Sequence, residues 1–180
     1  MKKIIKELLP YVVIFLVVVL IRTFLVTPVT VVGDSMVPTL HNKELLLLSK
    51  ISYKLHDIDR FDVVVIKDDD WIIKRIIGLP GDDVVYDNNT LYINGEIIKD
   101  EYGYGDTRDF NLNDICMAGL SNASDVNCPI DKIPEGYYLV LGDNRKISKD
   151  STTIGLIPYD EIQGKAIVRI WPLNKINVLN

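Results

Sequence analysis

Apolar residues run almost unbroken from Leu8 to Val26, and only short apolar stretches follow this run. Its unbroken part is Leu8–Ile21. A helix across the hydrocarbon core of a bilayer needs about 20 residues, so the 19 residues of the whole run suffice if the Arg22 side chain extends toward the headgroups. The pattern predicts a cytoplasmic tip and a single transmembrane anchor at residues 1–26.

Two alternatives exist for the same run, a cleavable signal peptide and a helix buried in a globular core. Basic residues before a short apolar stretch are typical of a signal peptide, but its cleavage site needs small residues. Residues 1–32 contain no Ala, Gly or Ser, which favours an uncleaved anchor. Because Lys2, Lys3 and Lys6 precede the run, the N-terminus is expected in the cytoplasm. We therefore expect a single-pass protein of the plasma membrane with an extracytoplasmic body at residues 27–180.

The body has the pattern of a mainly β, mostly antiparallel fold. Asn94-Gly95 supplies two residues that tolerate positive φ, so Leu91–Ile98 is predicted to be a hairpin with a type I′ turn. Helical periodicity is missing after the anchor, except for a weak pattern at Lys50–Ile58. Other apolar runs of strand length are Val63–Ile66, Trp71–Ile77, Val84–Tyr86, Tyr137–Leu141 and Lys165–Trp171.

The middle of the body differs from both ends. Residues 99–135 are polar, with scattered Gly, Asp and Asn. Stretches of this kind inside a compact domain are usually functional or form a small subdomain, so we expect about 83–135 to form a second β subdomain or insertion. Cys116 and Cys128 lie within it. An exported body permits a disulfide between them but does not require one, so a bridge and two free thiols both stay open.

Composition and charge exclude several function classes. With 48% hydrophobic residues among 180, the chain can bury a core and is not disordered. Residues 1–26 hold four basic residues and one acidic residue, a net charge of +3, whereas residues 27–180 hold 16 basic and 24 acidic residues, a net charge of −8. Because neutralisation of phosphates supplies most non-specific affinity for nucleic acid, an acidic body is a poor binder. No nucleic-acid partner is expected.

Common hydrolase motifs are missing from the chain. It has no GxSxG elbow, no Ser followed by Lys three residues later, no P-loop and no HExxH. His41 and His56 lie in polar stretches that predict exposed turns, and they are not at zinc-ligand spacing. A Ser-His-Asp triad that uses one of them is an alternative. No metal and no cofactor is expected.

Three segments remain as candidates for chemistry, and the first two contain reactive groups. In Val31–Leu40, Ser35 follows a glycine on a turn, where a substrate backbone can approach closely. In Trp71–Asp82, the neighbours Lys74 and Arg75 point to opposite faces of the expected strand, so one of them shares a face with isoleucines. Burial lowers the pKa of an amine from about 10.4, and a neutral amine is a competent general base. A solvent-reaching lysine on an edge strand is the alternative for Lys74.

The third segment, Gly142–Thr152, is a polar loop between two strands. Together the segments read SMxPTL at Ser35–Leu40, KRxxGxPGD at Lys74–Asp82 and GDNRxxSxDS at Gly142–Ser151. In this order, behind an N-terminal anchor, they resemble the bacterial type I signal peptidase family, in its Gram-positive form. Members of this family are membrane-anchored serine proteases that remove signal peptides from exported preproteins. The resemblance extends to about Trp171 and leaves out residues 99–135.

The resemblance implies a β body of the signal-peptidase type with a Ser-Lys dyad, in which Ser35 is the nucleophile and Lys74 the general base. Ser148 would orient Lys74, and Gly33 would lie near the oxyanion hole. Supporting polar contacts are implied for Asp143, Arg145 and Asp150. The implied substrate-binding residues are Val29, Val31, Val32, Gly33, Asp34, Ile72 and Ile73.

The implied substrate is a signal peptide that lies extended as an added strand between residues 29–33 and 71–73. Its small side chains at −1 and −3 would fit shallow pockets lined by residues such as Val31 and Ile73. The other implied partners are the lipid bilayer and, nearby, the secretion translocase. Ser35 lies nine residues beyond Val26. Nine extended residues reach about 30 Å at most, which keeps the chemistry near the membrane surface.

Three positions depart from the family pattern, one of them Ile147, which stands where members often have Asn. Gly33 stands where many members have a Ser, which removes a possible donor to the oxyanion; the loss of one such donor can cost about 100- to 1,000-fold in rate. Thr152 replaces the usual Arg, so an ion pair with Asp150 is expected to be missing.

Two other functions are weighed against a protease. An inactive assembly factor or chaperone would lack one dyad residue, and a self-cleaving regulator would need a DNA-binding domain and a scissile bond before Ser35.

Overall fold

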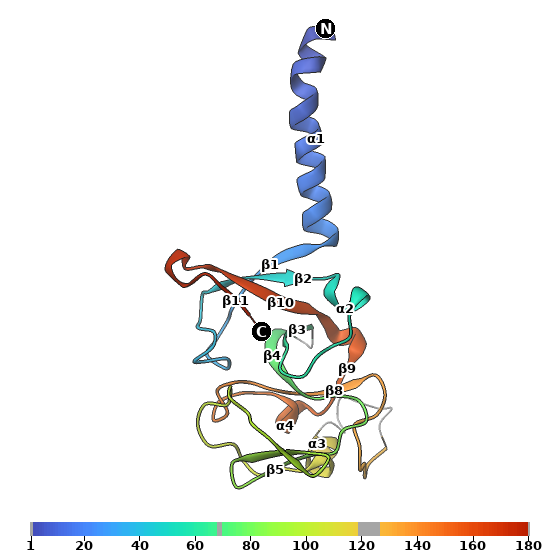
Figure 1. Ribbon diagram of the computed structural model, residues 1–180, viewed down its shortest axis with the longest axis vertical. Helices are drawn as coiled ribbons and strands as arrows, with labels where there is room; N and C mark the ends of the chain where they lie inside the picture. Colours follow the sequence, from blue (N-terminus) through green and yellow to red (C-terminus); the bar gives the residue numbers. More distant parts are fainter. Residues whose placement is uncertain (1, 68–69, 119–126, 180) are drawn as a thin grey trace.

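The computed structural model describes residues 2–67, 70–118 and 127–179. Helix α1 (Lys2–Phe24) has 23 residues and stands away from the body, and β1 (Val26–Thr30) follows it almost directly (Figure 1). Val26, expected at the end of the apolar span, lies in β1 instead and pairs with Ser49, because β-branched residues pack well in strands. Within the described ranges, no helix is both long and apolar enough to cross a membrane.

The body is built on one sheet of eight strands, in the order β1-β2-β10-β3-β4-β8-β9, with β11 paired to β10. Each of these pairings is antiparallel. The mainly β, antiparallel fold predicted from the sequence is thus confirmed. The strands are β2 (Leu45–Ser49), β3 (Val63–Lys67), β4 (Trp71–Gly78), β8 (Tyr137–Leu141), β9 (Ile157–Pro158), β10 (Ile162–Trp171) and β11 (Asn177–Val178).

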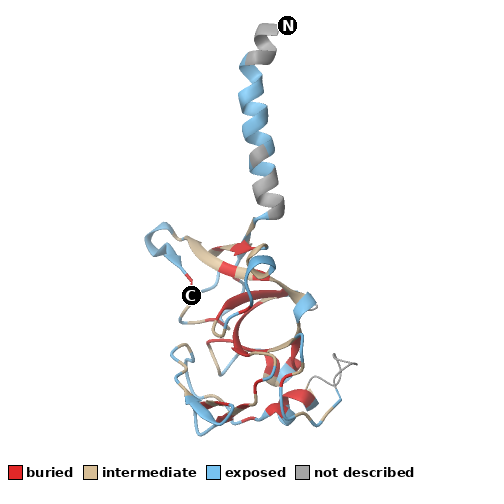
Figure 2. Cartoon of the chain, turned by 45° about the vertical axis from the view of Figure 1, so that its right-hand side comes forward, coloured by how far each residue is buried: buried red, intermediate tan, exposed pale blue. Residues whose placement is uncertain are grey.

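Strand β4 is buried on both of its faces. It lies between β3 and β8, and its residues from Ile73 to Gly78 are all buried. Ile73 packs in one apolar cluster with Val31, whereas Ile76 packs in a second cluster with Val64. Figure 2 shows this buried region in red at the centre of the body. Any charged side chain on this part of β4 is therefore held away from water.

A second, three-stranded sheet lies at the end of the body far from α1 (Figure 1). It consists of β5 (Val84–Asp87), β6 (Thr90–Ile93) and β7 (Glu96–Ile98). Asn94 and Gly95, both at positive φ (53° and 80°), form the turn of the predicted hairpin between β6 and β7. The apolar faces of these strands pack with residues of β4 and β8 in one cluster.

The polar middle of the chain is less irregular than its composition indicated. It contains α3 (Leu112–Ala118), whose first turn is capped by Asn111, because the Asn111 side chain accepts the N–H groups of Asn113 and Asp114. A disulfide joins Cys116 to Cys128, with their Cα atoms 5.9 Å apart. This bridge decides the question that the sequence left open.

Short helices complete the fold. They are α2 (Ser52–Leu55), α4 (Ser151–Ile154) and the 3₁₀ turns η2 (Tyr159–Glu161) and η3 (Leu173–Lys175). The weak helical pattern at Lys50–Ile58 corresponds to α2 alone. The sequence analysis did not predict β1, β2, β9 or β11. Strand β2 contains four consecutive leucines, a run without alternation, built from a residue that prefers helices.

Candidate active site

Ser35 lies on a tight turn beyond β1. Gly33 adopts φ +82°, a left-handed conformation that favours glycine, and the turn brings Ser35 back toward the body. The carbonyl of Ser35 accepts the N–H of Asn144 over 2.9 Å, which anchors the turn from the opposite side. Among the described residues, the Ser35 N–H has no hydrogen-bond acceptor, so it remains available to a bound group.

Lys74 extends from the buried part of β4 to this turn. Its Nζ lies 2.9 Å from the Oγ of Ser35, a hydrogen-bond distance. Lys74 is only 3% exposed, so the alternative of a solvent-reaching lysine is wrong. Burial lowers the pKa of Lys74 to about 8, against the opposing effect of the negative charges of Asp150 and Asp143. The site thus pairs a hydroxyl with an amine that loses its proton far more easily than an ordinary lysine.

Arg75, the next residue of β4, is fully buried and forms an ion pair with Asp143. Its Nε and Nη2 donate to the two carboxylate oxygens over 2.8 and 2.7 Å, and its Nη1 donates to the carbonyl of Phe61. Lys74 and Arg75 are therefore both buried, because β4 is covered on both faces. The pair ties the loop after β8 to the strand that carries Lys74.

Asp150 holds the other end of this loop. Its carboxylate accepts the N–H of Gly142 over 3.0 Å and caps α4 by accepting the N–H and hydroxyl of Thr152. Asp150 thus closes the loop 142–150 upon itself.

Ser148 lies beside the dyad but does not bond to it. A Cβ on Gly142 would lie 2.2 Å from the Oγ of Ser148 and 2.6 Å from the carbonyl oxygen of Ser35, so all three residues are in close contact. The Ser148 Oγ is buried without a hydrogen-bond partner among the described residues. The hydrogen bond to Lys74 that the resemblance implies is not formed here, and the orienting role of Ser148 stays a prediction.

A groove of about 510 Å³ opens onto Ser35 and Lys74. Of the predicted substrate-binding residues, Val32, Ile72 and Ile73 line it. Gly33 and Asp34 are exposed next to the groove, whereas Val31 is buried in the core and Val29 packs against the same cluster. The complete lining is Val32, Ser35, Asp70, Trp71, Ile72, Ile73 and Lys74.

The sequence analysis did not name Asp70 among the groove residues. Trp71 belongs to the stretch 71–73 along which the substrate was expected, and it is 53% exposed at the start of β4. His41 and His56 are absent from the groove lining, and His41 contacts Glu44 instead. A triad that uses either histidine therefore has no geometric support among the residues described.

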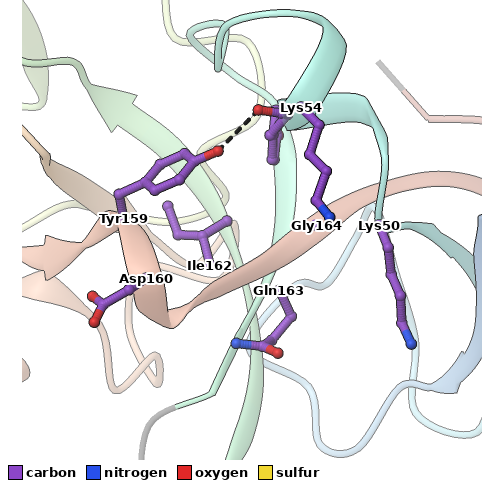
Figure 3. Close-up of a pocket in the computed structure, with 8 residues that line it drawn as sticks. Lys50, Lys54, Tyr159, Asp160, Ile162, Gln163 and Gly164 are labelled. Carbon is purple, nitrogen blue, oxygen red and sulfur yellow. Dashed lines mark hydrogen bonds between the residues drawn. The ribbon is translucent and has the colours of Figure 1, made fainter. Parts of the chain in front are cut away.

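A second pocket of about 390 Å³ lies between α2 and the start of β10 (Figure 3). Lys50 and Lys54 enter it from one side and Tyr159 from the other, where the Tyr159 hydroxyl donates to the carbonyl of Tyr53 over 2.9 Å. Its described lining contains no Ser, Cys or His. The groove at Ser35 is therefore the better candidate for catalysis.

Comparisons with known proteins point to one family. A family model described as "Signal peptidase, peptidase S26" matches residues 3–171. The signal peptidase IB of Staphylococcus aureus is 40% identical over 181 residues, which cover 94% of this chain and 93% of that protein. The signal peptidase I S of Bacillus subtilis is 38% identical over 163 residues, covering 89% and 85%.

A solved structure is similar as well. The crystal structure of a signal peptidase I from Enterococcus faecalis aligns with a TM-score of 0.51 and 32% identity, over 61% of this chain and 97% of that chain.

Proposed function

The chain belongs to the signal peptidase family, peptidase S26, and from this premise we propose that it cleaves signal peptides with a Ser35–Lys74 dyad. The observation that carries the proposal is the 2.9 Å separation of Lys74 Nζ and Ser35 Oγ, two residues that line the same groove. The lowered pKa of Lys74 supports it, since a general base works best when its pKa lies near the working pH.

In the proposed reaction, neutral Lys74 accepts the hydroxyl proton while the Ser35 oxygen attacks the carbonyl carbon of the scissile bond. The C–N bond then breaks, and the Lys74 ammonium returns the proton to the leaving amine. This step leaves the signal peptide esterified to Ser35. Lys74 next takes a proton from water while the water oxygen attacks the ester carbonyl carbon. The bond from this carbon to the Ser35 oxygen then breaks, the Lys74 ammonium returns the proton to Ser35, and the signal peptide leaves with a free carboxyl group. The dyad itself moves all the protons.

The negative oxygen of the tetrahedral intermediate needs hydrogen-bond donors. The N–H of Ser35, which has no acceptor among the residues that the structure describes, is the donor that we propose. Gly33 offers no hydroxyl, and its N–H is directed to the side chain of Asn42 over 3.3 Å. A second donor is thus expected from a group that moves when substrate binds.

The substrate is proposed to lie extended along the first residues of β4. Strand β8 pairs only with Arg75 and residues beyond it, so the edge of β4 from Trp71 to Lys74 is left for an added strand. Val32, Ile72 and Ile73 offer short apolar walls, which suit small side chains at −1 and −3 of the cleavage site.

Residues 1–26 are proposed to anchor the enzyme in the plasma membrane, with the N-terminus in the cytoplasm and the catalytic body outside, near the secretion translocase. Two features support the anchor, the basic residues before the apolar run and the exposure of the apolar side chains on α1. Exposed apolar surface of this size marks a site that contacts a membrane or a partner. The exposed side chains described on α1 include Leu8, Leu9, Val12, Val13, Ile14, Phe15, Leu16, Val18 and Val19.

The test uses the full chain in detergent and a preprotein with an Ala-x-Ala site. Wild type should release a mature protein whose N-terminus, read by mass spectrometry, begins directly after that site. Ser35→Ala should release none, with its fold checked by circular dichroism. Cleavage by Ser35→Ala at the wild-type rate would overturn the proposal, and an inert wild type would favour the assembly-factor alternative.

A further inference from the structure

The segment from Asp100 to Thr107 pairs with the loop that contacts Ser35, the nucleophile of the proposed dyad. We call residues 100–107 the clamp segment and residues 142–148 the dyad loop. Tyr104 donates its N–H to the carbonyl of Asp143 over 2.7 Å and accepts the N–H of Arg145 over 3.1 Å, a short parallel bridge. The clamp segment lies in the polar stretch where the sequence shows no recognised motif.

Arg145 is the side chain that joins the two segments. It is almost completely buried, with 2% of its side chain exposed, and it forms an ion pair with Asp100, whose side chain is 4% exposed. Its Nη1 donates to the hydroxyls of Tyr86 and Thr107 over 3.0 and 3.1 Å. Among the described residues, Asp100 is the only carboxylate paired with Arg145. Without it, a buried guanidinium would lose its counter-charge, which is costly in a protein interior.

From Arg145 the contacts continue to the nucleophile. The Nε of Arg145 donates to the carbonyl of Gly142 over 3.0 Å. Gly142 in turn packs so closely against Ser35 and Ser148 that an added Cβ would lie 2.6 Å from the Ser35 carbonyl oxygen. The Ser35 carbonyl also accepts the N–H of Asn144, in the same loop. A displacement of Arg145 therefore reaches Ser35 through direct contacts.

We propose that Asp100 is a positioning residue for signal peptide cleavage. Through Arg145 and Gly142 it holds the dyad loop where Ser35 meets the Nζ of Lys74. The inference rests on the proposed dyad. Asp100 does not line the groove, so its loss should leave KM within about twofold and lower kcat. Because a misplacement of about 1 Å can cost about 100-fold in rate, we expect kcat to fall about 10- to 100-fold.

The first experiment compares Asp100→Asn with Glu101→Gln in the full chain, using an internally quenched peptide with an Ala-x-Ala site. Glu101 is the matched control, since it is the next residue and its exposed carboxylate pairs only with exposed Lys99 among the described residues. Asp100→Asn should lose kcat at every pH without moving the acid limb of the profile, because Asp100 is not among the charges that shift the pKa of Lys74. Glu101→Gln should match wild type. Unchanged kcat in Asp100→Asn, or a loss confined to KM, would overturn the inference.

Two further variants test whether the effect travels through Arg145. Gly103→Ala keeps every charge, but its Cβ would lie 2.9 Å from Cζ of Arg145 and would push the guanidinium aside. It should lower kcat in the same way, and unchanged kcat would count against the proposed route. In an Arg145→Lys background, Asp100→Asn should lower kcat by less than a further twofold. Fully additive losses of kcat would contradict action through Arg145.

These outcomes separate the two proposals. If wild type cleaves and Ser35→Ala does not, while Asp100→Asn behaves like wild type, only the positioning role fails. If Ser35→Ala cleaves like wild type, the dyad itself fails.

Discussion

The pH dependence of cleavage follows directly from the burial of Lys74. Its pKa is lowered from 10.5 to about 8 because β4 removes the ammonium from water. At pH 7 about 9% of such an amine is neutral, against about 0.03% for an ordinary lysine, so the structure makes the base about 300 times more available. The rate should therefore rise with pH up to about 8 and then level off.

The assay is kcat/KM for an internally quenched Ala-x-Ala peptide without titrating side chains, measured in detergent from low to high pH. Below the pKa of Lys74 the rate should fall about tenfold per pH unit, and between pH 9 and 10 it should change by less than about 10%. An unperturbed lysine would instead give about an eightfold rise between pH 9 and 10. Such a rise, or a flat profile down to pH 6, would refute the reasoning.

Asp150 provides a second perturbation of the same profile. Its negative charge raises the pKa of Lys74, so Asp150→Asn should let that pKa fall further and move the acid limb to lower pH. Asn keeps an oxygen that can accept the N–H of Gly142, as Asp150 does. Asp160→Asn, at the second pocket, is the matched control and should leave the limb in place. A limb that moves to higher pH in Asp150→Asn would contradict the electrostatic account.

Three changes in stability are expected as well. Lys74→Met removes a buried amine whose protonated form lowers the free energy of unfolding by about 3 kcal/mol. This destabilisation is complete below about pH 8, where the amine is charged in both the folded and the unfolded chain, and it fades as pH rises to 10.5. The variant should therefore melt above wild type at pH 6, with a smaller gain at pH 10; an equal gain at both pH values would contradict this. Arg75→Met leaves Asp143 buried without its ion pair and should cost about 3–5 kcal/mol in urea unfolding; an unchanged urea midpoint would count against it. Replacing Cys116 and Cys128 together by Ala opens a loop of sequence separation 12 and should cost about 3 kcal/mol. Cleavage at room temperature should persist, because neither cysteine lines the groove. Loss of activity in a variant with an intact fold would contradict a purely structural role of the disulfide.

Local sequence signals predicted much of the sheet. Between two apolar runs, the Asn94-Gly95 sequence strongly favours a tight hairpin turn. Val63–Ile66 consists of residues that prefer strands. The signals failed where local preference and tertiary packing disagree. The leucines of β2 become a strand because β1 and β10 pair with them from both sides, and α3 begins at an Asn cap within a stretch of polar residues.

The site shows the same division. Alternation along β4 indicated that Lys74 or Arg75 would be buried, but only the covering of both faces explains why both are. Ser35 and Lys74 are 39 residues apart, so their meeting was indicated by resemblance rather than by any local pattern. The pairing of Asp100 with Arg145, 45 residues apart, has no local signal at all, because it depends on how the clamp segment packs.

The central claim is that Lys74 takes the proton of Ser35, and chemical rescue of Lys74→Ala tests it most directly. A general base contributes about 100- to 10,000-fold in rate, so this variant alone should be nearly inert while its melting curve shows an intact fold. Added methylamine should restore cleavage in proportion to its neutral form, whereas Ser35→Ala should stay inert at every concentration. Cleavage by Lys74→Ala without added amine, at a rate within about tenfold of wild type, would contradict the account.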